Sequence, residues 1–137
     1  MLKDRFNEVI SKFKSKKILV IGDLMLDTYL IGQSNRISPE APVPIIEVTK
    51  VEHNLGGAAN VALNLSSLGC KASLVGLIGD DTEGQVFRSL LDKSNIDFTS
   101  LVQSENRPTT VKSRIISHDQ QVIRTDREIT FDLSDES

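Results

Sequence analysis

Lys17-Ile18-Leu19-Val20-Ile21-Gly22-Asp23 is the stretch that decides the fold class. A continuous aliphatic and β-branched run that ends in glycine predicts a strand buried on both faces, as in a parallel sheet. Asp23 follows at the carboxyl end of this strand, which is the edge where open α/β sheets bind ligands. Because an unpaired buried carboxylate costs free energy, we expect Asp23 to have a partner or a ligand.

Helices and strands alternate further along the chain. Residues 56–69 have apolar side chains at helical spacing and end in a glycine, which favours a helix C-terminus there. The next strand is predicted at 72–77 and the next helix at 82–94. A separate N-terminal helix is predicted within 1–16, ahead of a domain that occupies 17–137. The alternation predicts a parallel α/β core.

The segment 30–52 differs in composition from the helices and strands around it. Pro39, Pro42 and Pro44 interrupt short β-prone pieces in it. Prolines exclude a helix and disfavour a central strand. We therefore predict a small β excursion outside the main sheet.

The end of the chain is predicted to form two strands and a helix start. Residues 110–117 and 121–126 are β-prone, and residues 118–120 between them predict a hairpin. Ser134 precedes two acidic residues, a pattern typical of a helix N-terminus. Because the helix begins where the sequence stops, we expect the chain to be the front part of a longer protein.

The composition excludes several classes of protein. Of 137 residues, 39% are hydrophobic and 26% charged, as in globular proteins, and the net charge of −3 offers no basic field for nucleic acid or anionic lipid. The longest apolar runs are far below the roughly 20 residues that span a membrane. Cys70 is the single cysteine, so there is no intrachain disulfide. With no secretory signal, these features predict a cytoplasmic protein without nucleic-acid or membrane partners.

The strongest local motif is Asn54-Leu55-Gly56-Gly57-Ala58-Ala59-Asn60-Val61-Ala62. Two glycines at a helix entrance let a ligand approach the backbone, where first-turn N–H groups can donate to its oxygens. The Asn60 amide can both donate to and accept from a hydroxyl. The alternative is a tight loop followed by a closely packed, alanine-rich helix.

Carboxylates form the second motif. Asp23 and Asp27 lie four residues apart and could accept hydrogen bonds from adjacent sugar hydroxyls, although a solvated loop or a helix cap is equally consistent. Asp80 and Asp81 could be imagined as a metal pair, but they are better explained as the cap of the helix that begins near Thr82.

Taken together, the motifs resemble a known family. Gly22-Asp23 with Asp27, the stretch Gly56-Gly57-Ala58-Ala59-Asn60, and Val75-Gly76-Leu77-Ile78-Gly79-Asp80 resemble the N-terminal half of the ribokinase-like, phosphofructokinase-B type sugar kinases. Ser34-Asn35-Arg36-Ile37-Ser38-Pro39-Glu40-Ala41-Pro42 and His118-Asp119-Gln120-Gln121-Val122-Ile123-Arg124 resemble the branch that phosphorylates heptose 7-phosphate in ADP-heptose synthesis.

The resemblance implies a fold, a reaction and a set of contacts. The fold is a ribokinase-like three-layer α/β/α sheet with a small β lid at 30–52, of which this chain is the N-terminal portion. The enzyme would transfer the γ-phosphate of ATP, with Mg²⁺, to the anomeric hydroxyl of D-glycero-D-manno-heptose 7-phosphate for lipopolysaccharide core synthesis. Asp27, Gly56, Gly57 and Asn60 would contact sugar hydroxyls, and Asp23 would support them. Members of the family often form a homodimer through the lid.

A phosphorylated sugar requires cations, because guanidinium and ammonium groups match phosphate oxygens. The candidates are Arg36 in the lid, with Lys112 and Arg124 on the late strands. Arg114 shares a strand face with Lys112 and is a further candidate, although it could equally belong to a solvated face.

The sequence departs from the family pattern in one respect. The family's catalytic base lies in a Gly-x-Gly-Asp motif of the second half, together with the nucleotide pocket, and neither that motif nor a Walker sequence occurs here. We therefore expect no catalytic or metal-binding residue in this chain, an ATP and Mg²⁺ site outside it, and no activity from the 137 residues alone. A kinase of the same family with another sugar acceptor, a non-catalytic sugar-phosphate-binding module and a truncated product remain alternatives.

Overall fold

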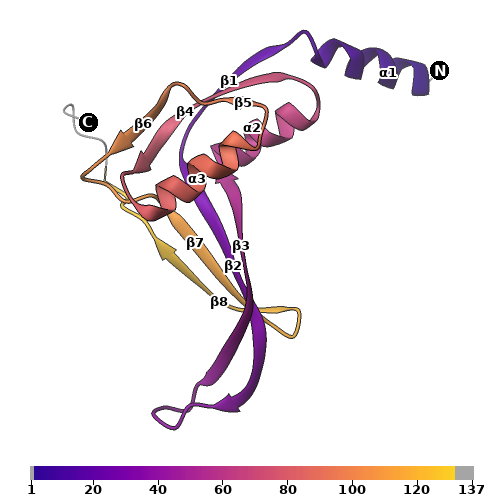
Figure 1. The fold of residues 1–137 in the computed structure, drawn as a ribbon. Helices are drawn as coiled ribbons and strands as arrows, with labels where there is room; N and C mark the ends of the chain where they lie inside the picture. Colours follow the sequence, from indigo (N-terminus) through magenta and orange to yellow (C-terminus); the bar gives the residue numbers. More distant parts are fainter. Residues whose placement is uncertain (1, 132–137) are drawn as a thin grey trace.

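The computed structural model describes residues 2–131, which form two sheets and three helices (Figure 1). The predicted N-terminal helix, first strand, central helix, second strand and following helix are all present, with ends shifted by a few residues. The helix predicted from Ser134 lies outside the described residues. In chain order the elements are α1 (Leu2–Phe13), β1 (Lys17–Ile21), β2 (Leu24–Ile37), β3 (Pro44–Gly57), α2 (Ala58–Ser67), β4 (Lys71–Gly79), α3 (Thr82–Asp92), β5 (Ile96–Asp97), β6 (Leu101–Ser104), β7 (Val111–Ser117) and β8 (Gln120–Arg127).

The first sheet, here called the core sheet, is parallel throughout. β4 pairs with β1 on one side and with β5 and β6 on the other. These pairings confirm the parallel α/β core that the alternation of elements predicts. None of the helices within residues 2–131 is long and apolar enough to cross a membrane.

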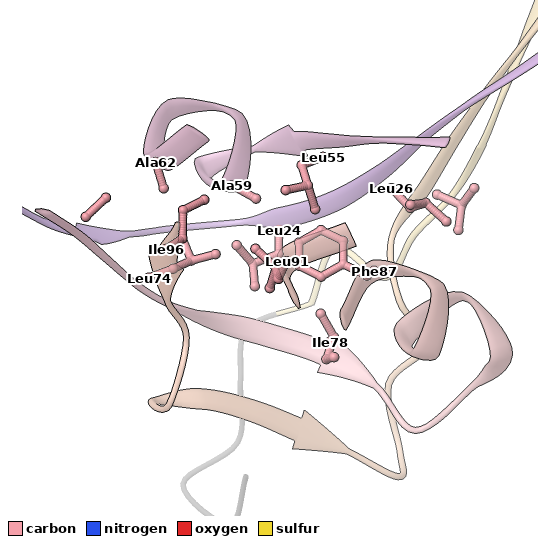
Figure 2. Packing of buried hydrophobic residues seen from close by; sticks show 12 residues of the cluster. Leu24, Leu26, Leu55, Ala59, Ala62, Leu74, Ile78, Phe87, Leu91 and Ile96 are labelled. Carbon is pink, nitrogen blue, oxygen red and sulfur yellow. The ribbon is translucent and has the colours of Figure 1, made fainter. Parts of the chain in front are cut away.

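Helices α2 and α3 cover one face of the core sheet, and the buried cluster lies beneath them (Figure 2). Phe87 and Leu91 of α3 are completely buried, as is Leu74 of β4. Cys70 is also buried, in agreement with a small apolar filler. The buried members of this cluster are Leu24, Leu26, Leu55, Ala59, Ala62, Ala72, Leu74, Ile78, Phe87, Leu91, Ile96 and Val111.

The other face of the core sheet is open, so the prediction that β1 is buried on both faces is wrong. Leu19 is 58% exposed and Ile21 is 69% exposed, and Val102 of β6 is exposed on the same side. Both packed helices lie against the opposite face, and no helix within residues 2–131 covers this one. An aliphatic run does not reveal how many of its faces are covered.

The second sheet, here called the lid sheet, has the strand order β3-β2-β7-β8. β2 and β3 form a long antiparallel arm that extends away from the helices (Figure 1). The predicted β excursion is confirmed, but its strands are longer than the short pieces expected at 31–33 and 43–51. Pro39 and Pro42 fall in the connection between the two strands, and Pro44 begins β3, so no proline interrupts either strand.

The predicted hairpin near the end of the chain is also confirmed, and it joins the lid sheet. β7 and β8 pair antiparallel through a turn in which His118 and Asp119 both have positive φ, of 51° and 60°. β7 then pairs parallel with β2 over residues 26–32. The local sequence predicts the hairpin but not the strand beside which it lies.

Hydrogen bonds of Asp81 connect the end of β4 in the core sheet to the start of β7 in the lid sheet, the strand that contains Lys112 and Arg114. Asp81 caps α3, as expected, with its Oδ1 accepting from the Gly84 amide at 2.8 Å. The same carboxylate accepts from the hydroxyl and the amide of the buried Thr109 at 2.6 and 2.9 Å. The Thr109 hydroxyl in turn accepts from the Gly79 amide at 2.9 Å. The start of β7 is thereby positioned against the end of β4.

Because this network is built on a carboxylate, the free energy of unfolding depends on pH. Burial alone would raise the pKa of Asp81, but hydrogen bonds from Thr109 and Gly84 hold it below its usual 3.8. A folded-state pKa below the unfolded one stabilises the fold above pH 4, and this contribution is lost as the pH falls through the folded pKa.

We expect the free energy of unfolding of Asp81→Asn, measured in urea, to differ most from the parent near pH 7. The difference should shrink below pH 4, and a constant difference would contradict the assignment.

Candidate functional site

The candidate site begins where β1, β2 and β3 approach one another at Gly57. This glycine has a φ of +57°, and a Cβ atom on it would lie 2.4 Å from the backbone oxygen of Asp23. That oxygen accepts a hydrogen bond from the Ala58 amide at 2.9 Å. On β4, a Cβ atom on Gly76 would lie 2.7 Å from the Gly22 oxygen. The first turn of α2 can therefore start directly over the end of β1.

Register places several polar side chains on one face of the lid sheet, here called the polar face. In β2, Asp27 lies between Asn54 of β3 and Lys112 of β7, and Asp126 of β8 is the next neighbour of Lys112. Side chains two residues further along a strand point to the same side. The polar face therefore includes a second row, formed by Glu52, Tyr29, Arg114 and Arg124.

Asp27 and Arg114 form the central ion pair of the polar face. Arg114 Nη1 lies 2.5 Å from Asp27 Oδ1, and the two side chains are only 22% and 20% exposed. This hydrogen bond is the main reason that the pKa of Arg114 is raised above its usual value. A Cβ atom on Gly56 would lie 2.6 Å from Asp27 Oδ2. The second carboxylate oxygen therefore lies against the glycine backbone at the entrance of α2.

Lys112 and Arg124 form a separate charged cluster beside this pair. Lys112 Nζ lies 2.9 Å from Asp126 and 3.1 Å from Glu128. The hydrogen bond that Lys112 donates to Asp126 contributes most to raising the pKa of Lys112, and the same bond is the main cause that lowers the pKa of Asp126. Arg124 makes two contacts with Asp126, at 3.0 and 3.2 Å. Both predicted cations thus lie on the polar face, and both are neutralised by carboxylates.

The structure places the remaining candidates as follows. Asp23 is exposed, so the burial from which a partner or a ligand was expected is not observed. Asn60 is exposed in the first turn of α2, where Asn64 donates to its backbone oxygen at 3.0 Å. Arg36 lies nine residues beyond Asp27 on the arm, and it faces Glu47 at 3.6 Å with both side chains exposed. The structure does not bring Arg36 to the other candidates.

A cleft of about 650 Å³ opens at the carboxyl ends of β1 and β4. Asp23 lines it, together with Met25, Arg107 and Glu128, whereas Asp27, the double glycine and Asn60 do not. The cleft continues onto the open apolar face of the core sheet. The polar face is the better candidate for a site because its carboxylates, amides and cations converge, and the cleft is mostly apolar sheet surface. Residues 2–131 contain no group of three His, Cys, Asp or Glu side chains that could hold a metal ion.

Sequence reasoning missed several residues of the polar face, among them Glu52, Asp126, Tyr29 and Asn54. Tyr29 lies under the Arg114 guanidinium, with 5.3 Å between the carbon of that group and the ring centre. Asn54 lies beside Asp27 and is exposed. A period-two reading of residues 24–37 as a strand would have placed Tyr29 on the face of Asp27. No local signal predicts the pairing with β3 that adds Asn54.

Comparison with known proteins gives the family. A family model described as pfkB family carbohydrate kinase matches residues 15–137. The chain belongs to the pfkB family of carbohydrate kinases. This match covers most of the chain, including every residue of the candidate site, and confirms the resemblance drawn from the motifs.

Within the pfkB family, the chain is similar to proteins named bifunctional protein HldE. It is 55% identical over 119 residues to the protein of Helicobacter pylori strain P12, which covers 87% of this chain and 26% of that one. It is 49% identical over 125 residues to the protein of Haemophilus influenzae strain PittEE, covering 91% and 26%. The chain thus spans about a quarter of the length of the curated relatives it matches.

Solved structures of other kinases have the same fold. A carbohydrate kinase from Agrobacterium tumefaciens superposes with a TM-score of 0.65 at 24% identity, over 82% of this chain and 35% of that one. A nucleoside kinase from Methanocaldococcus jannaschii, described as an archaeal member of the ribokinase family, superposes with a TM-score of 0.62 at 23% identity, over 82% and 36%. These likenesses establish a ribokinase-like fold for the N-terminal portion.

The close approach at Gly57 can be tested against a second glycine of positive φ. Gly69 has a φ of +91°, but its Cβ position is open, with the nearest atom 3.6 Å away. Both substitutions to alanine should lose about 1–3 kcal/mol of unfolding free energy, because each puts a side chain on backbone of positive φ. Gly57→Ala should lose a further 1–3 kcal/mol or so, because the new methyl group meets the Asp23 backbone. Equal losses in urea denaturation would mean that the approach is not tight.

Proposed function

We propose that this chain is the acceptor-binding part of a sugar kinase that phosphorylates the anomeric hydroxyl of D-glycero-D-manno-heptose 7-phosphate, in the synthesis of ADP-heptose for lipopolysaccharide. Membership of the pfkB family and the similarity to HldE proteins support a sugar kinase. The motifs around Arg36 and Arg124 resemble the heptose-phosphate branch of the family and support this acceptor.

The observation that carries the proposal is the Asp27 carboxylate at the entrance of α2. One oxygen is held by Arg114, and the other lies against Gly56. A carboxylate with one oxygen fixed can accept hydrogen bonds from adjacent hydroxyls with the other, in a defined direction. Asn54 lies next to it in the sheet, and its amide can donate to or accept from a neighbouring hydroxyl.

The reaction needs groups beyond this chain. A bond forms between the anomeric oxygen and the γ-phosphorus, the bond from that phosphorus to the bridging oxygen of ADP breaks, and the hydroxyl proton passes to a base. Residues 2–131 do not provide a fitting metal site, and the sequence has no Gly-x-Gly-Asp or Walker motif. We therefore assign ATP and Mg²⁺ to a site outside this chain. We expect the protein in the cytoplasm and the 137 residues alone to be inactive.

A direct assay tests this function. The intact gene product is incubated with ATP, Mg²⁺ and heptose 7-phosphate, and the sugar is followed by phosphorus NMR. A new anomeric phosphate supports the proposal. Turnover only with a fructose phosphate or a nucleoside would assign a different acceptor. Binding of heptose 7-phosphate without turnover would favour a non-catalytic sugar-phosphate-binding module.

Asp27→Ala tests the carboxylate that carries the proposal. Loss of a charge-assisted hydrogen bond of about 1.5–3 kcal/mol should lower kcat/KM for the sugar about 10- to 100-fold. The matched control is Asp92→Ala, which removes the same charge from the end of α3, outside the polar face. Unchanged kinetics for Asp27→Ala would remove this residue from the site.

We also propose a homodimer through the lid. The face of the lid sheet opposite the polar face carries an apolar row in register, formed by Val51, Leu30, Ile115 and Ile123. Val51 is 50% exposed and Ile123 is 51% exposed. The row runs across all four strands, so two copies could bury it against each other in a two-fold arrangement. A second copy of this chain is the partner expected there.

Charged substitutions test the dimer. Val51→Lys combined with Ile123→Lys should convert the intact protein to a monomer in analytical ultracentrifugation, because each buried lysine would lack a partner. Val9→Lys on α1 is the control, since Val9 is exposed on a helix remote from the lid sheet. A parent protein that stays monomeric at tens of micromolar, or a double variant that stays dimeric, would contradict the proposal.

A further inference from the structure

The cations of the polar face differ in how many of their hydrogen-bond donors are already used. Lys112 is shared between Asp126 and Glu128. Arg124 donates one hydrogen bond to Asp126, from Nη2 at 3.2 Å, and its Nε lies 3.0 Å from the same carboxylate. A new anion at Lys112 would compete with two carboxylates. Arg124 keeps Nη1 unengaged within residues 2–131, but its side chain is 53% exposed, where an ion pair is weakened by water.

Arg114 differs from both because its side chain is only 22% exposed while only one of its nitrogens is engaged. Nη1 donates to Asp27, while Nε and Nη2 have no acceptor within residues 2–131. A guanidinium carries five N–H donors in one plane, in a fork that matches two oxygens of a phosphate. The contact with the Tyr29 ring and the single bond to Asp27 hold this plane in place. Arg114 therefore presents oriented donors that no protein group in the described part of the chain occupies.

The position of Arg114 also fits a ligand that already touches Asp27. Asp27 and Lys112 share one row of the sheet, and Tyr29 and Arg114 share the next row on the same face. Successive rows on one face are about 7 Å apart along the strands. The Arg114 side chain reaches back from its row to Asp27, so a ligand whose hydroxyls bind the free carboxylate oxygen lies beside the two unengaged guanidinium nitrogens.

We propose that Arg114 is the residue that recognises the phosphate already present on the acceptor sugar, through Nε and Nη2, while its Nη1 keeps Asp27 oriented toward the sugar hydroxyls. This assignment rests on the proposed function, since it presumes a phosphorylated acceptor. It makes Arg114 a specificity-determining residue, and it leaves Lys112 and Arg124 to maintain the charge balance of the lid sheet. Burial of the pair to about four-fifths strengthens the interaction relative to exposed pairs.

The test compares two ligands on the intact protein. Dissociation constants of heptose 7-phosphate and of unphosphorylated heptose are measured by calorimetry for the parent, Arg114→Gln and Arg114→Lys. The preference for the phosphorylated sugar should fall about 10- to 100-fold in Arg114→Gln, as expected for charge-assisted hydrogen bonds. Arg114→Lys should recover part of it, because the charge returns without the fork. Arg88→Gln, a matched loss of charge on α3, should keep the full preference.

The outcomes separate this inference from the proposed function. A parent protein with no preference for the phosphorylated sugar would overturn the proposed acceptor, whatever the variants show. A parent with a clear preference that Arg114→Gln retains would overturn the assignment of Arg114 alone. Equal weakening of both sugars would reduce Arg114 to a positioning residue for Asp27. Circular dichroism confirms folding, and if Arg114→Gln does not fold, loss of the preference in Arg114→Lys relative to the parent decides the question.

Discussion

The structure depends on the close approach of backbone at Gly57. At this point the last residue of β3 lies over the carbonyl group of Asp23, at a distance that leaves no room for a side chain. The approach allows β2 to start only two residues after β1 ends and α2 to start immediately after β3. One short region therefore belongs to the core sheet, the lid sheet and the first packed helix at once. Asp27 is four residues from Asp23, so the same contact places the lid carboxylate beside the entrance of α2.

The two faces of the lid sheet differ: one contributes to the buried cluster and the other is the polar face. Leu26, Leu55 and Val111 lie on one face and belong to the buried cluster with α3. Asp27 and Lys112 alternate with them and lie on the other face. Because the side-chain period of a strand is two, a shift of one residue would exchange these faces. The hydrogen bonds between Asp81 and Thr109 position the start of β7 only two residues before Val111, and they thereby support the register that brings Arg114 to Asp27.

Local patterns predicted the individual helices and strands better than they predicted which of them lie side by side. Apolar spacing and turn residues predicted α2, α3, β4 and the β7–β8 hairpin, because these depend on residues close in sequence. The pairing of β7 with β2 joins residues more than 80 positions apart, and no local signal specifies it. For the same reason the ion pair between Asp27 and Arg114 could not be foreseen, although both residues were considered. Asp27 was placed beyond a strand end, either as a sugar-binding carboxylate or in a solvated loop or cap. Its position within a strand was not predicted, because β2 begins directly after Asp23 without a turn sequence between them.

The charge pattern of the polar face bears on how an anionic sugar could be selected. Three cations, Lys112, Arg114 and Arg124, are ion-paired with Asp27, Asp126 and Glu128, and Glu52 adds a further carboxylate to the face. These groups therefore give no net positive charge with which to attract a phosphate. Selection must then come from hydrogen-bond donors that remain free after the internal pairs have formed. Where a cation is shared between two carboxylates, as at Lys112, an incoming phosphate exchanges one anion for another and gains little. Where a guanidinium donates to a carboxylate through one nitrogen only, as at Arg114, its other two nitrogens can bind a ligand without breaking the internal ion pair. Under the proposed assignment, the phosphate contact and the sugar contact would depend on the same ion pair, so selection of an anionic sugar would rest on both together.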